Sequence, residues 1–451
     1  MSRLFGTDGV RGVANRELTP ELAMQIGRAA AGLLPQGARR KPVAIGRDTR
    51  VSGTMIESAL VAGLTSAGYD AISLGIVPTP GVACVTRAVE AAAGIVISAS
   101  HNPIEDNGIK IFGPDGFKLS DEIESRIEAS LAFDLARPTG TGVGIARVAQ
   151  NLVRHYYHEL YEGATELDGV HVIVDGGFGA AYAIAPYALR KLGARVSEIN
   201  CKADGARINV ASGATDLSGL RAAVRERIES GERTTIGVAF DGDADRALFV
   251  DETGEVVTGD HVLFALGCAM KARHELAGDT IVTTQMSNVG FERALRNHGI
   301  GLVRAAVGDR YVLEQMQRGG YNLGGEQSGH VIDFRYNTTG DGPRTAITLL
   351  GLVASQNVTL HELVREVVYA PQILLNVRTN RRDVLEHPAV IEAIAAAELE
   401  LADSGRIFVR ASGTEPLIRV MAEGDNRTMV EQIAARVAQR IEQEVARFVS
   451  T

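Results

Sequence analysis

Three aspartates at alternate positions are the strongest chemical signal in this chain of 451 residues. Asp241, Asp243 and Asp245 follow directly after the apolar run 236–240, and small residues separate them. Alternate positions of an extended chain face the same side, so the three carboxylates would repel one another unless a cation lies between them. Ligation by oxygen alone is typical of Mg²⁺ and Ca²⁺. The structural alternative is a solvated acidic turn.

An EF-hand calcium loop is the main alternative metal site for the same segment. The twelfth position counted from Asp241 is acidic, Glu252, but the sixth is Arg246, where an EF-hand requires glycine. The segment also follows a predicted strand, whereas an EF-hand loop joins two helices. We therefore expect a Mg²⁺ site whose remaining positions hold water and a substrate phosphate.

A short polar segment follows the apolar run 94–97, where a second strand is expected to end. It reads Ser98-Ala99-Ser100-His101-Asn102-Pro103, and its Asn-Pro pair predicts a turn. Ligands of open α/β sheets bind at the carboxyl ends of strands. Ser100 is therefore a candidate nucleophile, with His101 and Lys110 as neighbouring cations or bases. The alternative is an ordinary turn with capping serines, and the segment lacks the Gly-x-Ser-x-Gly elbow of hydrolases.

The segment 410–419 has the composition of an anion-binding loop. It offers two guanidinium groups, two hydroxyls and a glycine, from Arg410, Arg419, Ser412, Thr414 and Gly413. Guanidinium groups and a run of backbone amides suit a phosphate. The segment lacks the Gly-Lys-Ser/Thr end of a Walker A loop, and a plain hairpin is the alternative.

Three further polar segments are weaker candidates. The loop predicted over 324–330 carries Glu326 and Ser328, which suit sugar hydroxyls as acceptor and donor. The glycine-rich loop predicted over 6–12 is competent to bind an anion, but it lacks the spacing of a dinucleotide fingerprint. The segment 307–310 places one arginine in a predicted surface turn.

The elements that must position these segments repeat a pattern three times. An apolar strand, a polar turn, a helix and a second strand begin at 43–46, at 172–174 and at 280–283. This order predicts three α/β domains with mixed or largely parallel sheets. The helices are expected over 54–68, 181–191 and 291–296, the second strands at 195–199 and 302–303, and a turn at 106–108.

The C-terminal part of the chain follows a different order. Strands are predicted at 373–378, 406–409 and 417–421, with helices over 388–402 and 428–448, which indicates a small α+β domain. The chain is therefore expected to form four domains around a central cleft, over 1–153, 154–254, 255–369 and 370–451.

Composition narrows the class of protein. The formal net charge of −9 argues against a general nucleic-acid binder, which carries a basic surface. Cys84, Cys201 and Cys268 show neither a disulfide framework nor a zinc spacing, as expected in the cytoplasm. No apolar run reaches the roughly 18 residues of a membrane span, and 262–270 suits a buried helix. The N-terminus lacks the apolar core of a signal peptide.

Taken together and in order, these motifs resemble those of the α-D-phosphohexomutase superfamily. The resemblance runs from Phe5-Gly6-Thr7-Asp8-Gly9 to the terminal helix. It includes Ser-Ala-Ser-His-Asn-Pro, Asp-Gly-Asp-x-Asp-Arg, Gly-Glu-Gln-Ser-Gly-His and Ser-Gly-Thr-Glu-Pro.

The resemblance implies a role for each candidate residue. Ser100 corresponds to the serine that carries the phosphoryl group, and an oxygen of that group joins Asp241, Asp243 and Asp245 around Mg²⁺. Lys110 corresponds to a general acid or base, with His101 beside it, Arg246 facing the phosphoryl group and His330 near the reacting oxygen. The substrate-binding set is Glu326 and Ser328 for sugar hydroxyls, Arg410, Ser412, Gly413, Thr414 and Arg419 for the second phosphate, and Thr7 and Arg11 at the entrance.

The reaction implied is the interconversion of glucosamine 6-phosphate and glucosamine 1-phosphate through a sugar 1,6-bisphosphate, which also serves as activator. This isomerisation precedes UDP-N-acetylglucosamine and peptidoglycan synthesis. Priming of Ser100 by a kinase or by autophosphorylation, and a homodimer, are compatible with the resemblance. The alternatives are glucose or mannose phosphates as substrates, a Mg²⁺-dependent phosphatase, and a non-catalytic sugar-phosphate regulator. Gln327 and the segment 307–310 favour glucosamine by resemblance.

The sequence departs from the family pattern at Ala244, where glycine is the more usual spacer between the aspartates. Alanine allows the carboxylates to converge unless its backbone needs a positive φ. We therefore expect no effect on activity.

Overall fold

The computed structural model describes residues 4–6, 8–34, 41–132, 137–232, 234–412 and 416–449. The chain forms two compact units. The first comprises residues 1–284 and 303–365, and the second comprises 285–302 and 366–451. Each unit is described by itself below. No described helix is long and apolar enough to cross a lipid bilayer.

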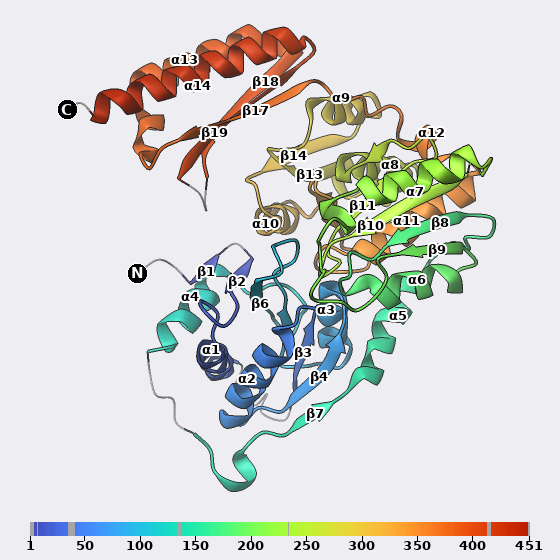
Figure 1. Ribbon diagram of the computed structural model, residues 1–451, viewed down its shortest axis with the longest axis vertical. Helices are drawn as coiled ribbons and strands as arrows, with labels where there is room; N and C mark the ends of the chain where they lie inside the picture. The colour runs from blue at the N-terminus through green and yellow to red at the C-terminus, as the bar shows by residue number, and fades with distance from the viewer. Residues whose placement is uncertain are drawn as a thin grey trace. The chain divides into compact units, whose positions relative to one another are not determined.

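The first sheet of unit 1 has seven strands in the order β1-β2-β6-β5-β3-β4-β7. It is mixed, because β3 pairs in parallel with β4 and β5, whereas β6 runs antiparallel to β2 and β5. Helices α1 and α2 pack together (Figure 1). Apolar residues of α1, α2, β3 and β5 form one core. The strands are β1 (Phe5–Gly6), β2 (Gly9–Val13), β3 (Val43–Arg47), β4 (Ala71–Ile76), β5 (Ala93–Ile97), β6 (Asp106–Phe112) and β7 (Ala146–Val148).

The helices of this part begin at recognisable signals. The Thr19 side chain accepts a hydrogen bond from the amide of Leu22, and Pro20 occupies the first position of α1. Ser120 caps α4 in the same way. The helices are α1 (Pro20–Leu33), α2 (Gly53–Ser66), α3 (Thr79–Ala88) and α4 (Asp121–Ser130), and α5 (Arg154–Tyr161) leads to the second sheet.

The second sheet has five strands in the order β12-β11-β10-β8-β9. Strands β8 and β10 are parallel and wholly buried, while β10 and β11 form an antiparallel hairpin whose loop carries the three aspartates. The elements are β8 (His171–Asp175), α6 (Ala181–Lys191), β9 (Arg195–Ile199), α7 (Ser218–Glu229), β10 (Thr235–Phe240), β11 (Ala247–Val250) and β12 (Val256–Val257). The predicted bounds of α6 and β9 are confirmed.

The third sheet has four strands in the order β14-β13-β15-β16. Helix α8 covers the apolar run 262–270, and most of its residues are buried, as predicted. The elements are α8 (Gly259–Ala272), β13 (Thr280–Thr284), β14 (Gly301–Ala305), α10 (Asp309–Gly319), β15 (Leu323–Gly325), β16 (Val331–Asp333), α11 (Gly342–Gln356) and α12 (Leu360–Val364).

Unit 2 is built on a three-stranded antiparallel sheet in the order β17-β19-β18. Its core lies between this sheet and the two long helices. Residues 285–302 belong to the same unit, because the Arg406 guanidinium donates to the carbonyl oxygens of Gln285 and Ser287, at 2.6 and 2.8 Å. The elements are α9 (Val289–Asn297), β17 (Gln372–Arg378), α13 (Pro388–Leu401), β18 (Gly405–Ala411), β19 (Leu417–Gly424) and α14 (Arg427–Val449).

One local prediction was wrong, and three were wrong in part. The expected turn at 106–108 is the start of β6, and the expected loop at 324–330 begins as β15. Residues of the predicted loop 6–12 belong to the β1–β2 hairpin, and the predicted turn at 307–310 leads into α10. Gly108 and Gly324 mark crowding rather than turning, whereas Gly9, Gly308 and Gly329 have positive φ. A Cβ at Gly108 would lie 2.5 Å from the Ser98 carbonyl oxygen, and one at Gly324 would lie 2.9 Å from the Val282 carbonyl oxygen.

Candidate active site

Ser100 and the acidic loop meet, although 141 residues separate Ser100 from Asp241. The Ser100 hydroxyl donates to Oδ2 of Asp241 at 2.6 Å, and His101 Nδ1 lies 3.3 Å from the same hydroxyl oxygen. Ser100 follows β5 and Asp241 follows β10, so strand ends of two sheets supply the pair. Ser100 is 1% exposed and adopts φ +51°, a left-handed conformation that is costly for a serine.

The three aspartates converge as predicted. All are buried, and each offers a carboxylate oxygen within 4.8 Å of the others. Oδ1 of Asp243 and Oδ1 of Asp245 are buried and have no hydrogen-bond partner within the described residues. Unpaired carboxylate oxygens in a buried site are costly unless a cation binds them. This set of oxygen donors therefore fits Mg²⁺.

The pKa values of two aspartates in the acidic loop shift in different directions. Burial raises the pKa of Asp241 well above its usual value, and the negative charges of Asp245 and Asp243 raise it further. Burial also raises the pKa of Asp243, but Lys110 and a hydrogen bond from Thr79 outweigh it and hold that pKa below its usual value. The pKa values of Asp243 and Asp241 thus shift in opposite directions, because Lys110 and Thr79 contact Asp243.

The loop geometry excludes an EF-hand and changes the expectation for Ala244. Strands precede and follow the loop, where an EF-hand has helices. Ala244 adopts φ +57°, so this position does need the backbone conformation that favours glycine. Alanine at this position therefore does carry a conformational cost.

Lys110 lies among three carboxylates. Its Nζ is 3.0 Å from Oδ2 of Asp243, 3.4 Å from Oδ2 of Asp245 and 3.3 Å from Oδ1 of Asp8. Burial lowers the pKa of this amine, but the two neighbouring aspartates raise it by more, so that the pKa lies above its usual value. Lys110 is therefore an ammonium cation in this arrangement.

Lys110 is surrounded by further charged residues. Not all of them were identified from the sequence. Lys118 donates to Oδ1 of Asp8 at 2.7 Å and also to Asp309. Burial raises the pKa of Asp309, yet Lys118 and His330 hold it below its usual value. Asp8 and Asp309 lay in segments already singled out, whereas nothing in the sequence marks Lys118.

The other predicted residues of unit 1 border the same charges. Arg11 donates to Oδ1 of Asn102 at 2.9 Å and to Asp8. His330 Nε2 lies 3.6 Å from Oδ2 of Asp309, and the backbone of His330 forms a bridge with that of Arg246.

Arg246 and the predicted sugar loop are also close in space. Burial lowers the pKa of the Arg246 guanidinium, but Asp245, Asp241 and Glu326 together raise it above its usual value. The Ser328 hydroxyl is buried and has no hydrogen-bond partner among the described residues. An unpaired buried hydroxyl suits a ligand that supplies a donor or acceptor.

The predicted phosphate clamp lies in unit 2. Arg410 and Arg419 are directly opposite one another on β18 and β19. Burial and the charge of Arg419 lower the pKa of Arg410. Ser412 is 2% exposed, and its carbonyl oxygen accepts from Arg382 at 3.0 Å. Thr7, Gly413 and Thr414 lie outside the described residues.

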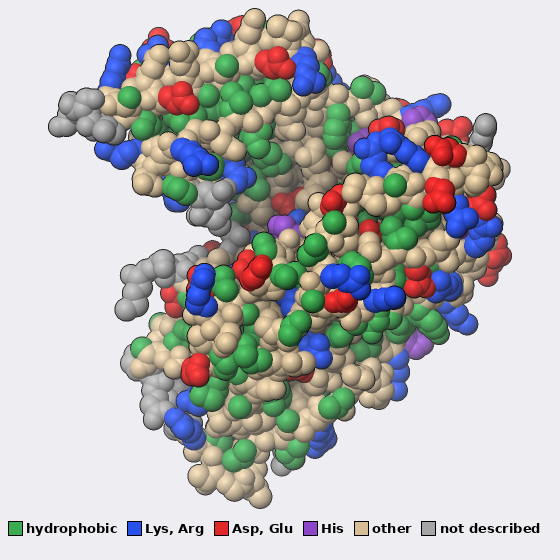
Figure 2. Space-filling view, viewed as in Figure 1, with side chains coloured by type: hydrophobic (Ala, Val, Ile, Leu, Met, Phe, Trp, Pro, Cys, Tyr) green, Lys and Arg blue, Asp and Glu red, His purple; other side chains and the backbone are tan. Residues whose placement is uncertain are grey.

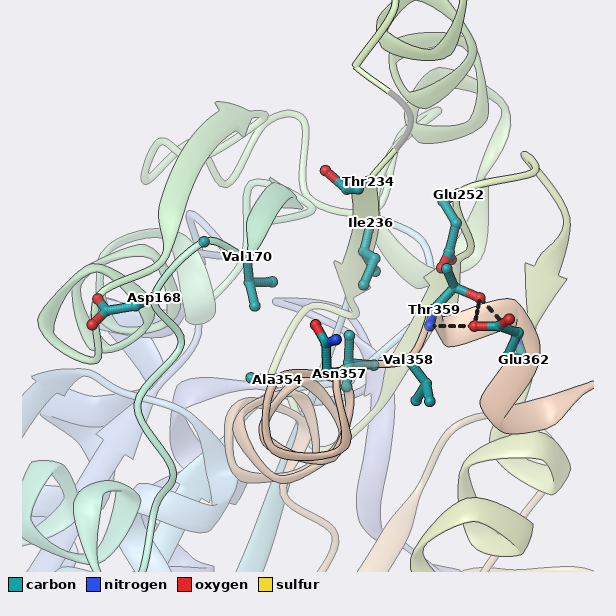
Figure 3. A pocket seen from close by; sticks show the side chains of 12 residues that line it. Asp168, Val170, Thr234, Ile236, Glu252, Ala354, Asn357, Val358, Thr359 and Glu362 are labelled. Carbon is teal, nitrogen blue, oxygen red and sulfur yellow. Dashed lines mark hydrogen bonds between the residues drawn. The ribbon is translucent and has the colours of Figure 1, made fainter.

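A cavity of about 310 Å³ lies elsewhere in unit 1 and contains none of the predicted site residues. Residues of the α11–α12 connection line it, together with the amino ends of β8 and β10 (Figure 3). Its polar groups Thr359 and Glu362 bond to each other as the capping box of α12. Thr359 and Glu362 are therefore used within the fold.

The surface charge matches the composition. On the viewed face of unit 1, Lys and Arg side chains are interspersed with Asp and Glu (Figure 2). This face carries no broad basic area of the kind that nucleic-acid binding requires.

Comparison with known families accounts for most of the chain. The phosphoglucomutase/phosphomannomutase family matches in four parts. Its α/β/α domains I, II and III match residues 2–135, 154–254 and 258–370, and its C-terminal domain matches 374–440.

Relatives of similar length share about half of the residues. A phosphoglucosamine mutase of Saccharopolyspora erythraea is 49% identical, over 98% of this chain and 99% of the relative. One of Symbiobacterium thermophilum is also 49% identical, over 99% and 100%.

Solved structures of lower identity share the fold. A phosphoglucomutase/phosphomannomutase family protein of Burkholderia thailandensis has a TM-score of 0.83 at 23% identity, over 98% of both chains. The structure of a putative phosphomannomutase from Thermus thermophilus has a TM-score of 0.75 at 23% identity. The match covers 97% of this chain and 98% of the other. The predicted four-domain architecture of the superfamily is confirmed.

Proposed function

This chain belongs to the phosphoglucomutase/phosphomannomutase family, the α-D-phosphohexomutases, and we propose that it interconverts glucosamine 6-phosphate and glucosamine 1-phosphate. It is an isomerase of the mutase type. The choice of sugar is supported by full-length relatives, at 49% identity, that carry the name phosphoglucosamine mutase.

The observation that carries the proposal is the 2.6 Å hydrogen bond from the Ser100 hydroxyl to Asp241, within a buried group of three carboxylates. A serine that only caps a turn needs no such partner. We propose that Ser100 carries the phosphoryl group, and that Asp241, Asp243 and Asp245 hold Mg²⁺ beside it. When bound, Mg²⁺ neutralises charge on the phosphoryl oxygens during transfer.

Lys110 is the proposed proton donor. Phosphoryl transfer depends on positioning and charge neutralisation, and the leaving oxygen of Ser100 must receive a proton. The raised pKa of Lys110 keeps its amine protonated, so that a proton is available for the leaving oxygen in the first half of the reaction, and His101 lies next to the same oxygen. In the return half, Lys110 takes the proton back from Ser100 as phosphate returns to it.

The remaining predicted residues bind the sugar phosphate. Arg246 faces the transferring phosphoryl group, and His330, whose Nε2 lies 3.6 Å from Asp309, receives the proton of the sugar hydroxyl that attacks. Glu326 and Ser328 hold the other sugar hydroxyls, and Thr7 and Arg11 lie at the entrance. The non-reacting phosphate is held by Arg410, Ser412, Gly413, Thr414 and Arg419.

The two half-reactions are balanced. The attacking sugar hydroxyl forms an O–P bond as the Ser100 O–P bond breaks, which gives glucosamine 1,6-bisphosphate. The bisphosphate turns end for end, and its other phosphate returns to Ser100. The same bisphosphate is the proposed activator. We also propose a cytoplasmic location, supported by three cysteines that form no disulfide, with priming by a kinase or by autophosphorylation and a homodimeric state.

The experiment that tests the proposal combines intact mass with turnover. Wild-type protein should carry one extra phosphoryl group on Ser100 and should isomerise glucosamine phosphate faster than glucose or mannose phosphates. Ser100→Ala should lose the phosphoryl group and isomerisation while retaining the fold. Near wild-type turnover of this variant in the presence of glucosamine 1,6-bisphosphate would refute the proposal, and release of inorganic phosphate without isomerisation would indicate a phosphatase.

A further inference from the structure

Asp48 and Arg50 form an ion pair that touches neither the acidic loop nor any proposed substrate contact. The Arg50 Nε lies 3.0 Å from Oδ2 of Asp48, and both side chains are 0% exposed. Burying two charges is costly, and replacing such a pair by apolar residues is often neutral or stabilising. Stability alone therefore gives no reason to keep the pair here.

From the contacts around this pair we infer that Asp48 and Arg50 are positioning residues, which hold the main chain of Ser100 in its left-handed conformation. The inference rests on the proposed role of Ser100 as phosphoryl carrier, and it concerns the geometry of that carrier.

The amide side of Ser100 is fixed through Ser98. The Ser100 N–H donates to Oγ of Ser98 at 2.8 Å, and the Ser98 hydroxyl donates to Oδ2 of Asp48 at 2.6 Å. Oδ1 of Asp48 accepts from the amide of Arg50 at 2.8 Å, which fixes the carboxylate plane. The Asp48 carboxylate thus sets the orientation of the Ser100 amide through two successive hydrogen bonds.

The carbonyl side of Ser100 is fixed by Arg50 itself. One terminal nitrogen, Nη2, donates to the carbonyl oxygens of Ser100 and Asn102, at 2.9 and 2.8 Å. The other, Nη1, donates to the carbonyl oxygens of Pro103 and Asp106. Together with the Nε bond to Asp48, all five N–H donors of the guanidinium are used. A lysine, with three donors on one atom, cannot reproduce this set.

The conformation that these bonds hold is one that serine avoids. A left-handed backbone costs a non-glycine residue roughly 1–2 kcal/mol, so it persists only where the surroundings impose it. Asn209 supplies one further bond to the Ser100 carbonyl oxygen, at 2.8 Å. Burial raises the pKa of Asp48 to about 6, even though the charge of Arg50 lowers it. The two charges of the pair therefore depend on each other.

The test compares Arg50→Lys and Ser98→Ala with a matched control, Arg47→Lys. Arg47 lies on the same segment and pairs with Glu57 at 2.9 Å, but it does not contact residues 98–106 within the described hydrogen bonds. Both test variants should lower kcat, by about 100-fold for Arg50→Lys because a misplaced reacting group costs about that much, and should leave KM within twofold. Arg47→Lys should keep kcat within twofold.

A second measurement separates positioning from folding and from the proposed function. Hydrogen–deuterium exchange of peptides covering 98–106 should be faster in Arg50→Lys and Ser98→Ala than in wild type or Arg47→Lys, with the remaining peptides unchanged. Folded test variants with wild-type kcat and wild-type exchange would overturn the inference. Should Arg50→Lys not fold, Ser98→Ala decides, because it removes one hydroxyl and leaves the ion pair intact. An inactive wild-type protein would refute the proposed function, and the exchange data would still decide the inference.

Discussion

The hydroxyl of Thr79 donates to Oδ2 of Asp243 at 2.6 Å, and the Thr79 amide donates to the Asp243 carbonyl oxygen at 2.9 Å. Thr79 is the first residue of α3, whereas Asp243 lies in the loop after β10. Residues near a helix N-terminus stabilise an anion through its unpaired amides. The first sheet's helices therefore help to set the orientation of a carboxylate that the second sheet supplies.

Thr79→Val is expected to weaken Mg²⁺ binding without removing a ligand. Loss of one hydrogen bond is worth about 0.5–1.5 kcal/mol, which corresponds to roughly a 3- to 10-fold rise in Kd. Isothermal titration with Mg²⁺ measures this change. Thr79→Ser keeps the hydroxyl and should bind Mg²⁺ like wild type, and equal affinities for the valine and serine variants would contradict the prediction.

Ala244→Gly is expected to stabilise the protein. Relief of a left-handed alanine gains roughly 1–2 kcal/mol, and the greater freedom of glycine in the unfolded chain costs about 0.5–1 kcal/mol. A net gain of about 0.5–1 kcal/mol should raise Tm by a degree or two in a thermal melt. Ala239→Gly in β10 is the control, since Ala239 is not among the positive-φ residues and glycine weakens a strand. A lower Tm for both variants would show that Ala244 is not strained.

Arg410→Gln is expected to weaken substrate binding more than turnover. Arg410 and Arg419 present two like charges directly opposite one another, which destabilises a strand pair until an anion binds between them. Loss of a charge-assisted bond to phosphate costs about 1.5–3 kcal/mol, so KM should rise roughly 10- to 100-fold.

The control for Arg410 is Arg378→Gln, an exposed arginine on β17 of the same sheet. It should leave KM unchanged. Inorganic phosphate should raise the Tm of wild type and Arg378→Gln more than that of Arg410→Gln, and an equal rise in all three would place the phosphate elsewhere.

Glu159 should make the protein more stable as the pH falls from 7 towards 5. Burial raises the pKa of Glu159 to about 7, although Arg87, at 2.8 Å, opposes the rise. The folded state then binds a proton that the unfolded state releases, so stability is present below the unfolded pKa of 4.5 and is lost as pH rises through 7. Glu159→Gln should flatten this slope in Tm measured between pH 5 and 8. The exposed Glu162→Gln should keep it, and parallel slopes for both variants would refute the assignment.

Local patterns predicted several of the elements but not the charge network. The bounds of α6 follow from its apolar periodicity and the glycine after it, even with Pro186 inside the helix. Asp241, Asp243 and Asp245 could be grouped because alternate spacing is a local property. Lys118 could not be found in this way, because its partners Asp8 and Asp309 are 110 and 191 residues away.

The failures have a common physical reason. Glycine was interpreted as a sign of turning at 106–108 and at 324–330, but in the structure Gly108 and Gly324 lie in strands and allow backbones to approach closely. Arg50 went unnoticed because a lone arginine in a loop is usually solvated. Four of its five bonds reach main-chain oxygens of a segment that only the folded chain brings near.

Unit 2 is built from two separate segments of the chain, 285–302 and 366–451. This limits where segments can be exchanged with those of a relative. Asn288 donates to the carbonyl oxygen of Ala370 and to Glu423, while Arg406 holds the carbonyl oxygens of Gln285 and Ser287. In a chimera that takes only residues 370–451 from a relative, Asn288, Gln285 and Ser287 would come from one protein and their hydrogen-bond partners from the other. A crossover that also exchanges 285–302 would carry the whole bonded set, so functional recombinants in this family should inherit the two segments together.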